Sequence, residues 1–237
     1  MKDDFDEVVA GGRTHRGVVL LSGGLDSAVT AWIAKGECGD LYTLTFHYGQ
    51  AHSKEIRCAS ELSWALGVRD HKVLGLPLNL IGGSSLFNKD EIPTSEVEGI
   101  PSTWVPQRNS IFLAIAFGWT ETLGCDRVYI GVNSVDYSGY PDCRPEFIEK
   151  MSNALNLASK KYVESDGRGF IEVHTPLSGL SKAEIIKKGA ELGVPFRETT
   201  SCYKGEEEAC GSCSSCRLRL KGFREAGLVD PIKYRGG

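Results

Sequence analysis

The stretch that decides the fold is residues 18–33, which read Val-Val-Leu-Leu-Ser-Gly-Gly-Leu-Asp-Ser-Ala-Val-Thr-Ala-Trp-Ile. The four aliphatic residues at its start are typical of a strand that is buried on both faces. Residues 22–24 can form a turn whose backbone N–H groups point into one hollow. Asp26 and Ser27 follow where a helix begins, and the unpaired N–H groups and dipole of a helix start favour an anion. The sequence therefore predicts a strand, an anion-binding loop and a helix.

The turn contains no lysine, and the Gly-x-x-x-x-Gly-Lys-Ser/Thr pattern of a Walker loop is absent from the sequence. This favours a loop that holds the part of ATP that leaves as pyrophosphate. The alternative is an ordinary strand-to-helix turn, because Ser and Gly are common turn residues.

Composition predicts a globular protein with a packed core. The chain has 237 residues, of which 41% are hydrophobic and 24% charged. Its longest uncharged apolar run, residues 111–119, is far shorter than the ~20 residues that span a bilayer. The start of the chain is acidic, unlike a signal or transit peptide. We expect a cytoplasmic protein without a membrane partner, and the formal net charge of −4 gives no sign of a nucleic-acid partner.

Apolar periodicity predicts strands that alternate with helices along the chain. The expected strands are residues 18–21, 41–46, 71–74, 127–132 and 170–175. The expected helices are residues 26–33, 53–66, 109–123, 145–158, 181–192 and 217–226. Asn109 is expected to cap a helix that is buried nearly all round, Ser181 and Glu184 form a capping box, and Gly227 ends the last helix. This order indicates an α/β fold with a doubly wound, five-stranded, mainly parallel sheet.

Three parts are expected. Residues 1–16 form a flexible N-terminal segment, residues 17–195 a nucleotide-binding α/β domain, and residues 196–237 a small helical zinc-binding segment. Residues 75–108 are predicted to be an active-site loop, since a stretch this long without periodic structure is uncommon in a compact domain. In doubly wound sheets ligands bind beyond the carboxyl ends of the strands. The loops after Leu21, Phe46 and Val132 should converge there.

Four cysteines near the C-terminus predict a metal site. Cys202, Cys210, Cys213 and Cys216 are separated by seven, two and two residues, a spacing that lets four sulfurs surround one ion. Structural zinc is the favoured interpretation, and the alternatives are an iron–sulfur cluster or redox-active or sulfur-carrying thiols. Cys143 lies in a polar loop, so its thiol is a candidate for chemistry.

Several stretches resemble one enzyme family. Residues 22–27, Ser-Gly-Gly-Leu-Asp-Ser, resemble the pyrophosphate loop of ATP pyrophosphatases. Residues 48–50, 105–109, 131–145, 180–185 and 201–203, with the cysteine cluster, resemble the QueC family from about residue 18 to residue 226. The most specific part is Val-Asp-Tyr-Ser-Gly-Tyr-Pro-Asp-Cys-Arg at residues 135–144. Ala51 and Gln107 depart from the family pattern.

The resemblance implies conversion of 7-carboxy-7-deazaguanine and ammonia to the nitrile 7-cyano-7-deazaguanine with ATP, in queuosine biosynthesis. It also implies an adenine nucleotide alpha hydrolase-like fold, Mg²⁺ and Zn²⁺ as cofactors, and a homodimer. The implied catalytic residues are Asp26, which helps place Mg²⁺, and Arg108 and Lys182, which offset phosphate charge. The implied ATP-binding residues are Leu20, Ser22, Gly23, Gly24, Leu25, Asp26, Ser27, Phe46 and Gln50. The implied substrate-binding residues are Asn109, Asp136, Tyr137, Tyr140, Asp142, Cys143 and Arg144.

Plainer roles exist for several of these residues. Lys182 could be a solvated residue of a helix, Arg108 could cap a helix, and Leu20 could be an ordinary core residue. Three other functions use parts of the same pattern: a tRNA sulfur-transfer enzyme, an amidotransferase-type synthetase for NAD or GMP, and a non-catalytic zinc protein that binds a partner. The first of these needs a reactive cysteine, and the last predicts no ATP consumption.

Overall fold

The core of the protein is one fully parallel sheet. The computed structural model describes residues 15–50, 54–88, 92, 99–133, 140–204 and 207–235. The sheet has five strands in the order β3-β2-β1-β4-β5, and each neighbouring pair is parallel. The strands are β1 (His15–Leu20), β2 (Cys38–His47), β3 (Asp70–Gly75), β4 (Arg127–Ile130) and β5 (Glu172–His174). The predicted α/β fold with a doubly wound parallel sheet is confirmed.

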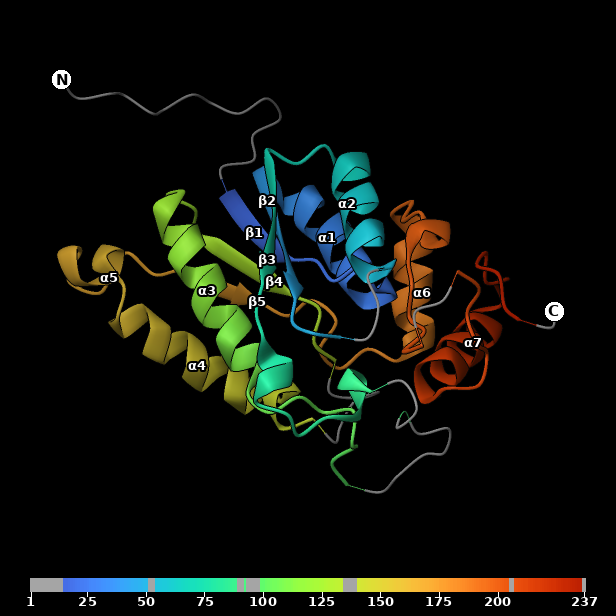
Figure 1. The fold of residues 1–237 in the computed structure, drawn as a ribbon. Coiled ribbons are helices and arrows are strands. Elements are labelled where there is room, and N and C mark those ends of the chain that lie inside the picture. The colour runs from blue at the N-terminus through green and yellow to red at the C-terminus, as the bar shows by residue number, and fades with distance from the viewer. Residues whose placement is uncertain are drawn as a thin grey trace.

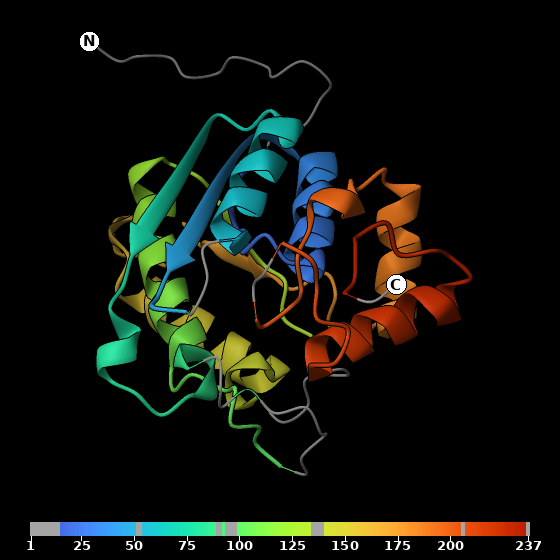
Figure 2. The same cartoon turned by 45° about the vertical axis from the view of Figure 1, so that its right-hand side comes forward.

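Helices cover both faces of this sheet, as Figure 1 shows. On one side lie α3 and α4, and on the other lie α1, α2 and α6, with α7 packed outside α6 (Figures 1 and 2). The helices are α1 (Leu25–Glu37), α2 (Lys54–Leu66), α3 (Arg108–Thr122), α4 (Pro145–Leu157), α5 (Lys160–Glu164), α6 (Lys182–Glu191) and α7 (Ser214–Ala226). Short 3-10 helices are η1 (Leu78–Leu80), η2 (Ser85–Phe87), η4 (Pro141–Cys143) and η5 (Phe196–Glu198).

The alternation of side chains along β1 divides the core in two. Val19 and Leu21 pack into the cluster formed with α1, α2 and α6, whereas Val18 and Leu20 pack into the cluster formed with α3 and α4. Successive residues of a strand point to opposite faces of the sheet, so an uninterrupted apolar strand must be covered on both. The aliphatic start of the deciding stretch is therefore the reason that β1 lies at the centre.

The strand order reverses between β1 and β4. The chain runs from β1 outward to β2 and β3, and then returns to place β4 on the other side of β1. The loops that follow β1 and β4 consequently diverge to opposite faces and leave a crevice at the carboxyl ends of the strands. Gly131, just after β4, comes close to the start of α1, since a Cβ there would lie 3.1 Å from the Ser27 nitrogen.

Several predicted boundaries differ from the structure, among them the start of β1 and the start of α7. β1 begins at His15, so the last two residues of the predicted flexible segment 1–16 belong to the sheet, and the Arg16 N–H donates to Asp126 Oδ1 at 2.8 Å. The rest of that segment lies outside the described residues. The last helix begins at Ser214, three residues before the predicted start, and ends at Gly227 as expected, with φ of 75°.

Helix α3 is not buried all round, and Asn109 is not its cap. Gln107 occupies the N-cap position, and Asn109 lies within the first turn. Leu113, Ala116 and Phe117 are buried, while Ala114 on the opposite side is exposed. The helix packs one face on the sheet, and small or aromatic residues on its outer face keep the sequence apolar without being covered.

The capping box at the start of α6 is confirmed. The Ser181 side chain accepts from the Glu184 N–H, and the Glu184 carboxylate accepts from the Ser181 N–H at 2.8 Å. This fixes the start of the helix that carries Lys182. Within the described residues, every helix is too short or too polar to cross a membrane.

Candidate functional site

A cavity of about 240 Å³ opens at the carboxyl ends of β1, β2 and β4. It collects residues from segments that are far apart in the sequence. Of the residues predicted for the site, those that line it are Leu20, Ser22, Gly24, Leu25, Asp26, Ser27, Phe46, Gln50, Arg108, Asn109, Tyr140, Cys143 and Lys182. The structure thus brings the predicted nucleotide residues and part of the predicted substrate residues into one space.

Two serines shape the loop at one end of this cavity. The Ser27 hydroxyl donates to the Gly24 carbonyl at 3.0 Å and accepts from the Ser22 N–H at 3.2 Å. The Ser22 hydroxyl accepts from the Gly24 N–H at 3.3 Å. Gly24 is the N-cap of α1 and has no side chain with which to cap it. The first turn of α1 therefore presents backbone N–H groups at an edge of the cavity, which is the arrangement that binds phosphate.

Gly23 does not line the cavity but is required by the turn. Its φ is +82°, and a Cβ there would lie 2.2 Å from the Glu55 carbonyl oxygen. Its own carbonyl accepts from the Thr200 N–H at 2.9 Å. Gly23 therefore lets the loop pass between α2 and the C-terminal segment.

Lys182 and Asp26 form an ion pair in the cavity wall. The Lys182 Nζ donates to both Asp26 carboxylate oxygens at 2.7 Å, and the two side chains are 7% and 17% exposed. The pair joins the first turn of α6 to the first turn of α1. A solvated position for Lys182 is excluded by this burial, and a positive charge stands beside the phosphate loop.

Arg108 supplies a second positive charge at the start of α3. Its guanidinium lies over the Tyr48 ring, 5.7 Å from the centroid, and Nη1 donates to the Tyr48 hydroxyl at 3.5 Å. Burial by itself would lower the pKa of this guanidinium, but the facing Tyr48, Tyr140 and Asp142 side chains raise it. Arg108 is therefore a permanent cation that faces the cavity.

An apolar wall adjoins these charges. Phe46 and Phe112 are stacked, with centroids 4.1 Å apart and planes at 14°, and both line the cavity together with Leu20. Leu20 and Phe46 also belong to the core, so each has a structural role as well. Flat apolar surfaces of this kind suit a purine ring.

Gln50 and Glu55 complete the wall near Tyr48. The Gln50 Oε1 accepts from the Tyr48 N–H at 2.7 Å, which folds the segment after β2 back on itself. Burial raises the pKa of the Glu55 carboxyl to about 7, against the lowering effects of the Arg108 charge and of a hydrogen bond from Gln50. Glu55 lines the cavity and was not predicted from the sequence. An acidic residue in the first turn of a helix is usually explained by the helix dipole, so nothing in the sequence distinguished it.

The predicted substrate residues are divided among different places. Tyr140 lines the cavity, and its hydroxyl bonds that of Thr103 at 2.7 Å. Asp142 lies behind the cavity lining, where Oδ2 accepts from the Asn109 N–H at 3.0 Å and so caps α3. Arg144 is exposed, and its Nε donates to the Pro141 carbonyl at 3.1 Å. Asp136 and Tyr137 lie outside the described residues.

Asp142 and Arg144 were both predicted to bind the substrate, and the structure shows why they lie elsewhere. Asp142 is drawn under the start of α3, whose first N–H groups need an acceptor that Gln107 does not supply. Arg144 precedes α4 at a turn, and the 3-10 helix η4 directs it outward. Neither side chain lines the cavity.

Cys143 lines the cavity as a protonated thiol. Burial raises its pKa to about 12, although the Arg108 charge opposes this, and the Asn109 amide donates to its sulfur at 3.5 Å. Since the thiolate is the reactive form, this environment does not favour a nucleophile.

The four C-terminal cysteines form a closed cluster. Their sulfur atoms all lie within 4.8 Å of one another, and Cys202, Cys213 and Cys216 are buried. Backbone N–H groups point at two of the sulfurs, from Cys210 to Cys202 and from Cys213 to Cys210, at 3.4 Å each. Four thiols with such donors fit the Cys₄ shell of a structural zinc ion. These residues fit the predicted metal site, and an all-cysteine shell leaves no open coordination position.

Arg219 connects this cluster to the cavity. It is 1% exposed, and its Nε and Nη2 pair with the two Asp230 oxygens at 2.8 and 2.9 Å. Nη1 donates to the Thr199 hydroxyl at 2.8 Å. Five residues of this part of the chain line the cavity, namely Thr200, Ser201, Tyr203, Ser215 and Arg219. Ser201 and Tyr203 belong to a stretch that resembles the family, whereas nothing in the sequence distinguished Thr200, Ser215 or Arg219, since their positions depend on how the C-terminal segment packs.

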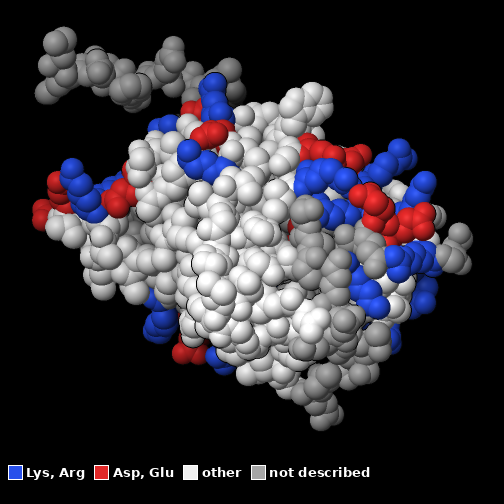
Figure 3. All heavy atoms as spheres, in the orientation of Figure 1, with Lys and Arg blue, Asp and Glu red and all other residues white. Residues whose placement is uncertain are grey.

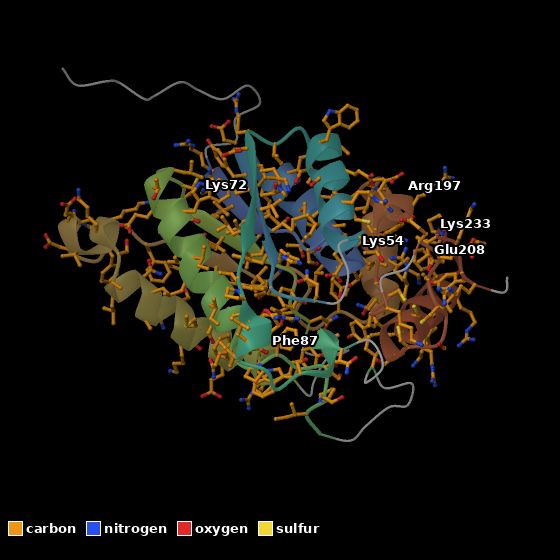
Figure 4. The ribbon with its side chains drawn as sticks, in the orientation of Figure 1. Lys54, Lys72, Phe87, Arg197, Glu208 and Lys233 are labelled. Carbon is orange, nitrogen blue, oxygen red and sulfur yellow. The ribbon has the colours of Figure 1, made fainter. Side chains whose placement is uncertain are left out.

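The C-terminal segment is also held by α2. The Lys54 Nζ donates to the Glu207 carbonyl at 2.6 Å, and the Arg57 guanidinium contacts the Glu207 carboxylate at 3.0 Å. Figure 4 shows Lys54 at the start of α2, on the side where Glu208 lies. From the predicted active-site loop 75–108, Leu86 and Arg108 line the cavity, and residues 89–91 and 93–98 lie outside the described residues.

Comparisons with known proteins agree with this architecture. The sequence model of the family described as "Queuosine biosynthesis protein QueC" matches residues 16–227. A 7-cyano-7-deazaguanine synthase of Stutzerimonas stutzeri (strain A1501) is 51% identical over 222 residues, covering 92% of this chain and 98% of the relative. One of Pseudomonas savastanoi pv. phaseolicola is 51% identical, covering 92% and 96%. Among solved structures, NMN synthetase from Francisella tularensis shares the fold, with a TM-score of 0.50 at 14% identity over 91% of this chain and 78% of that one. The chain therefore belongs to the QueC family of queuosine biosynthesis proteins.

Proposed function

We propose that this protein is an ATP-dependent ligase that converts 7-carboxy-7-deazaguanine and ammonia to 7-cyano-7-deazaguanine. The observation that carries the proposal is the Lys182–Asp26 pair beside the residue 22–27 loop, in a cavity that also holds Arg108. Two cations thus line the cavity that contains the backbone anion site, which supports release of pyrophosphate there.

The first chemical step activates the acid. A carboxylate is a poor electrophile, because its charge is delocalised and its oxygen is a poor leaving group. Transfer of AMP to one carboxylate oxygen, with loss of pyrophosphate, gives an acyl adenylate. The N–H groups at the start of α1 bind the departing pyrophosphate, while Lys182 and Arg108 offset the charge that builds on it. Ammonia then attacks the acyl carbon and displaces AMP to form an amide.

The second step removes the remaining oxygen. A second adenylation on the amide oxygen turns it into a leaving group, and its departure as AMP leaves the nitrile. Both adenylations need the same loop and the same two cations. One cavity therefore serves both steps, with the purine ring of ATP against Leu20 and Phe46.

Binding of the deazaguanine rests on the Tyr140 end of the cavity. Tyr140 and Asn109 both line the cavity, and Asp136 and Tyr137 belong to the same stretch of sequence as Tyr140. A guanine-like ring has N–H donors that suit a carboxylate and a face that suits tyrosine. Asp142 and Arg144 contribute by holding this stretch against α3 and η4.

Two metal ions have separate roles. Mg²⁺ enters with ATP, and Asp26 would hold it together with phosphate oxygens, a donor set that Mg²⁺ prefers. Both Asp26 oxygens contact Lys182 here, so Lys182 would shift toward the phosphates. The four cysteines would hold Zn²⁺, which stabilises the segment that carries Arg219.

The alternative functions are supported less well. Sulfur transfer in the cavity needs a thiolate there, but burial raises the pKa of Cys143, which lines the cavity, to about 12. Binding of a tRNA would favour a basic surface, whereas on the face that Figure 3 shows the Lys and Arg side chains near α6 and α7 are mixed with Asp and Glu. The cytoplasmic location, the homodimer and the absence of a nucleic-acid partner stay predictions.

The test measures pyrophosphate release and product formation together. With ATP, Mg²⁺, ammonium and 7-carboxy-7-deazaguanine, we expect pyrophosphate and a product with the mass of the nitrile. Without the acid, pyrophosphate release should fall to the background rate. Release that is independent of the acid, or no release with any purine carboxylate, would defeat the proposal.

A further inference from the structure

The proposed reaction needs a group that prepares the nitrogen nucleophile. At neutral pH ammonia in water is present mainly as ammonium, which has no lone pair with which to attack carbon. A site that binds ammonium and takes one proton from it would supply ammonia next to the acyl adenylate. The inference that follows rests on the proposed function and assigns this task to one residue.

The acidic side chains that line the described part of the cavity are Asp26 and Glu55. Asp26 is engaged by Lys182 through both carboxylate oxygens. Glu55 instead interacts with the side-chain amide of Gln50. Of the two, Glu55 is the carboxylate that can approach a second cation without first breaking an ion pair.

The groups around Glu55 suit reversible proton transfer. Arg108 faces it from α3, and Tyr48 and Gln50 face it from the segment after β2. Burial raises the pKa of Glu55 to about 7, while the Arg108 charge and the Gln50 hydrogen bond oppose that rise. Both protonation states are therefore populated near neutral pH, which is where a general base works best.

Aromatic rings beside Glu55 favour a small cation. Tyr48 and Phe112 line the same cavity, with ring centroids 5.7 Å apart. Ring faces attract ammonium through their quadrupole. A carboxylate, an amide and two aromatic rings thus line the same cavity as the loop proposed to bind pyrophosphate.

We propose that the Glu55 carboxylate binds ammonium and accepts one of its protons, so that ammonia is released at the acyl adenylate. The N–H bond electrons remain on nitrogen as the lone pair, and Glu55 becomes the neutral acid. The lone pair then forms the C–N bond while the C–O bond to AMP breaks, and AMP leaves with that electron pair. The proton that the new amide nitrogen sheds passes to AMP and solvent, and Glu55 returns its own proton to solvent.

The decisive experiment compares the Glu55→Gln variant with the unchanged protein, using two different nucleophiles. The kcat/KM of the variant for ammonium should fall about 10²-fold, the usual contribution of a general base. With hydroxylamine, which is already unprotonated at neutral pH, the rate of hydroxamate formation should stay within a few-fold of the unchanged protein. The acid-dependent exchange of labelled pyrophosphate into ATP should also persist in this variant. Glu61→Gln, on an exposed position of the same helix, is the matched control and should change none of these.

Several outcomes would overturn the proposal. Equal losses with ammonium and hydroxylamine would make Glu55 a general structural residue, and loss of acid-dependent exchange would place it in adenylation. An unchanged ammonium rate would also contradict it. Failure of the proposed function itself looks different, because the unchanged protein would then show no acid-dependent exchange.

A second measurement needs no variant. If Glu55 binds ammonium, KM expressed as total ammonium should be nearly constant as the pH rises above neutral. If the protein takes free ammonia from solution, KM should fall in proportion to the proton concentration.

Glu55→Asp, which keeps the carboxylate, should restore part of the ammonium rate lost in Glu55→Gln, and no restoration would count against a proton acceptor.

Discussion

The phosphate loop (residues 22–27) and the cysteine segment (residues 202–216) both contribute residues to the cavity but are built in opposite ways. In residues 22–27 the hydrogen bonds that Ser22 and Ser27 make within the loop span at most five residues, and both serines line the cavity. In residues 202–216 the four sulfurs lie within 4.8 Å of one another, and none of the four cysteines lines the cavity. The first region is open, which suits a site that binds a ligand. The second is closed, which suits a structural metal site.

The two regions are nevertheless joined. The Thr200 N–H donates to the Gly23 carbonyl at 2.9 Å, which ties the C-terminal segment to the loop. Gly222 of α7 faces Lys182, and a Cβ there would lie 2.4 Å from Lys182 Cγ. Figure 2 shows α6 and α7 side by side. The cysteine segment therefore supports the site through α7, although its sulfurs do not line the cavity.

The largest effect should come from opening the closed region. Cys213→Ser removes one of the four ligands, and we expect the bound zinc to be lost together with much of the ~10 kcal/mol that such sites contribute to folding. Metal analysis should give one zinc per unchanged chain and little in the variant, with a large drop in Tm. Cys58→Ala, outside the cluster, should keep its zinc. Full metal content in Cys213→Ser would contradict the cluster.

The next effect comes from the open region. Lys182→Ala should lower acid-dependent pyrophosphate release about 10²–10³-fold, because it removes a charge from the site where phosphate charge develops. Zinc content should not change, which separates this loss from that of Cys213→Ser. Lys188→Ala, exposed on the same helix, is the control. Activity close to normal in Lys182→Ala would show that the pair with Asp26 is only structural.

Gly222→Ala tests the connection between the regions. A methyl group has no room beside Lys182 Cγ and Ile186 Cδ1, at 2.4 and 2.9 Å, so we expect a loss of about 1–3 kcal/mol in the free energy of unfolding. Turnover should fall as well, because Lys182 must move. Gly118→Ala is matched to it, since a Cβ there meets nothing within 4 Å. Equal stability and turnover in both variants would remove α7 from the support of Lys182.

The smallest effect concerns the charge of Glu55. Burial raises its pKa from 4.5 to about 7, so between these values the folded chain holds a proton that the unfolded chain has released. The free energy of unfolding of the unchanged protein therefore falls by about 1–3 kcal/mol as the pH rises through this window. Glu55→Gln has no such proton, and its free energy of unfolding relative to the unchanged protein should increase with pH. Urea unfolding at several pH values checks this, and a pH-independent difference would show that the pKa is not raised.

The same contrast explains how much could be predicted from the sequence. The strand, loop and helix of residues 18–33 depend on neighbours in the chain, so periodicity and turn chemistry were sufficient. The cysteine spacing was likewise a local pattern. The positions of Asp142, Arg144 and Glu55 depend on which distant element covers them. The Asp142 side chain caps the start of α3, the Arg144 side chain is exposed to solvent, and the Glu55 side chain lines the cavity. Residues whose role is set by packing, such as Arg219, leave no local mark.

The central claim is that one cavity activates the same carbon twice through AMP, and oxygen labelling tests it most directly. The acid is prepared with ¹⁸O in both carboxylate oxygens and converted with ATP and ammonium. We predict that both labelled oxygens leave in AMP, one from the acyl adenylate and one from the adenylated amide, with two AMP formed per nitrile. Label in water or inorganic phosphate, or a single labelled AMP per nitrile, would contradict the account.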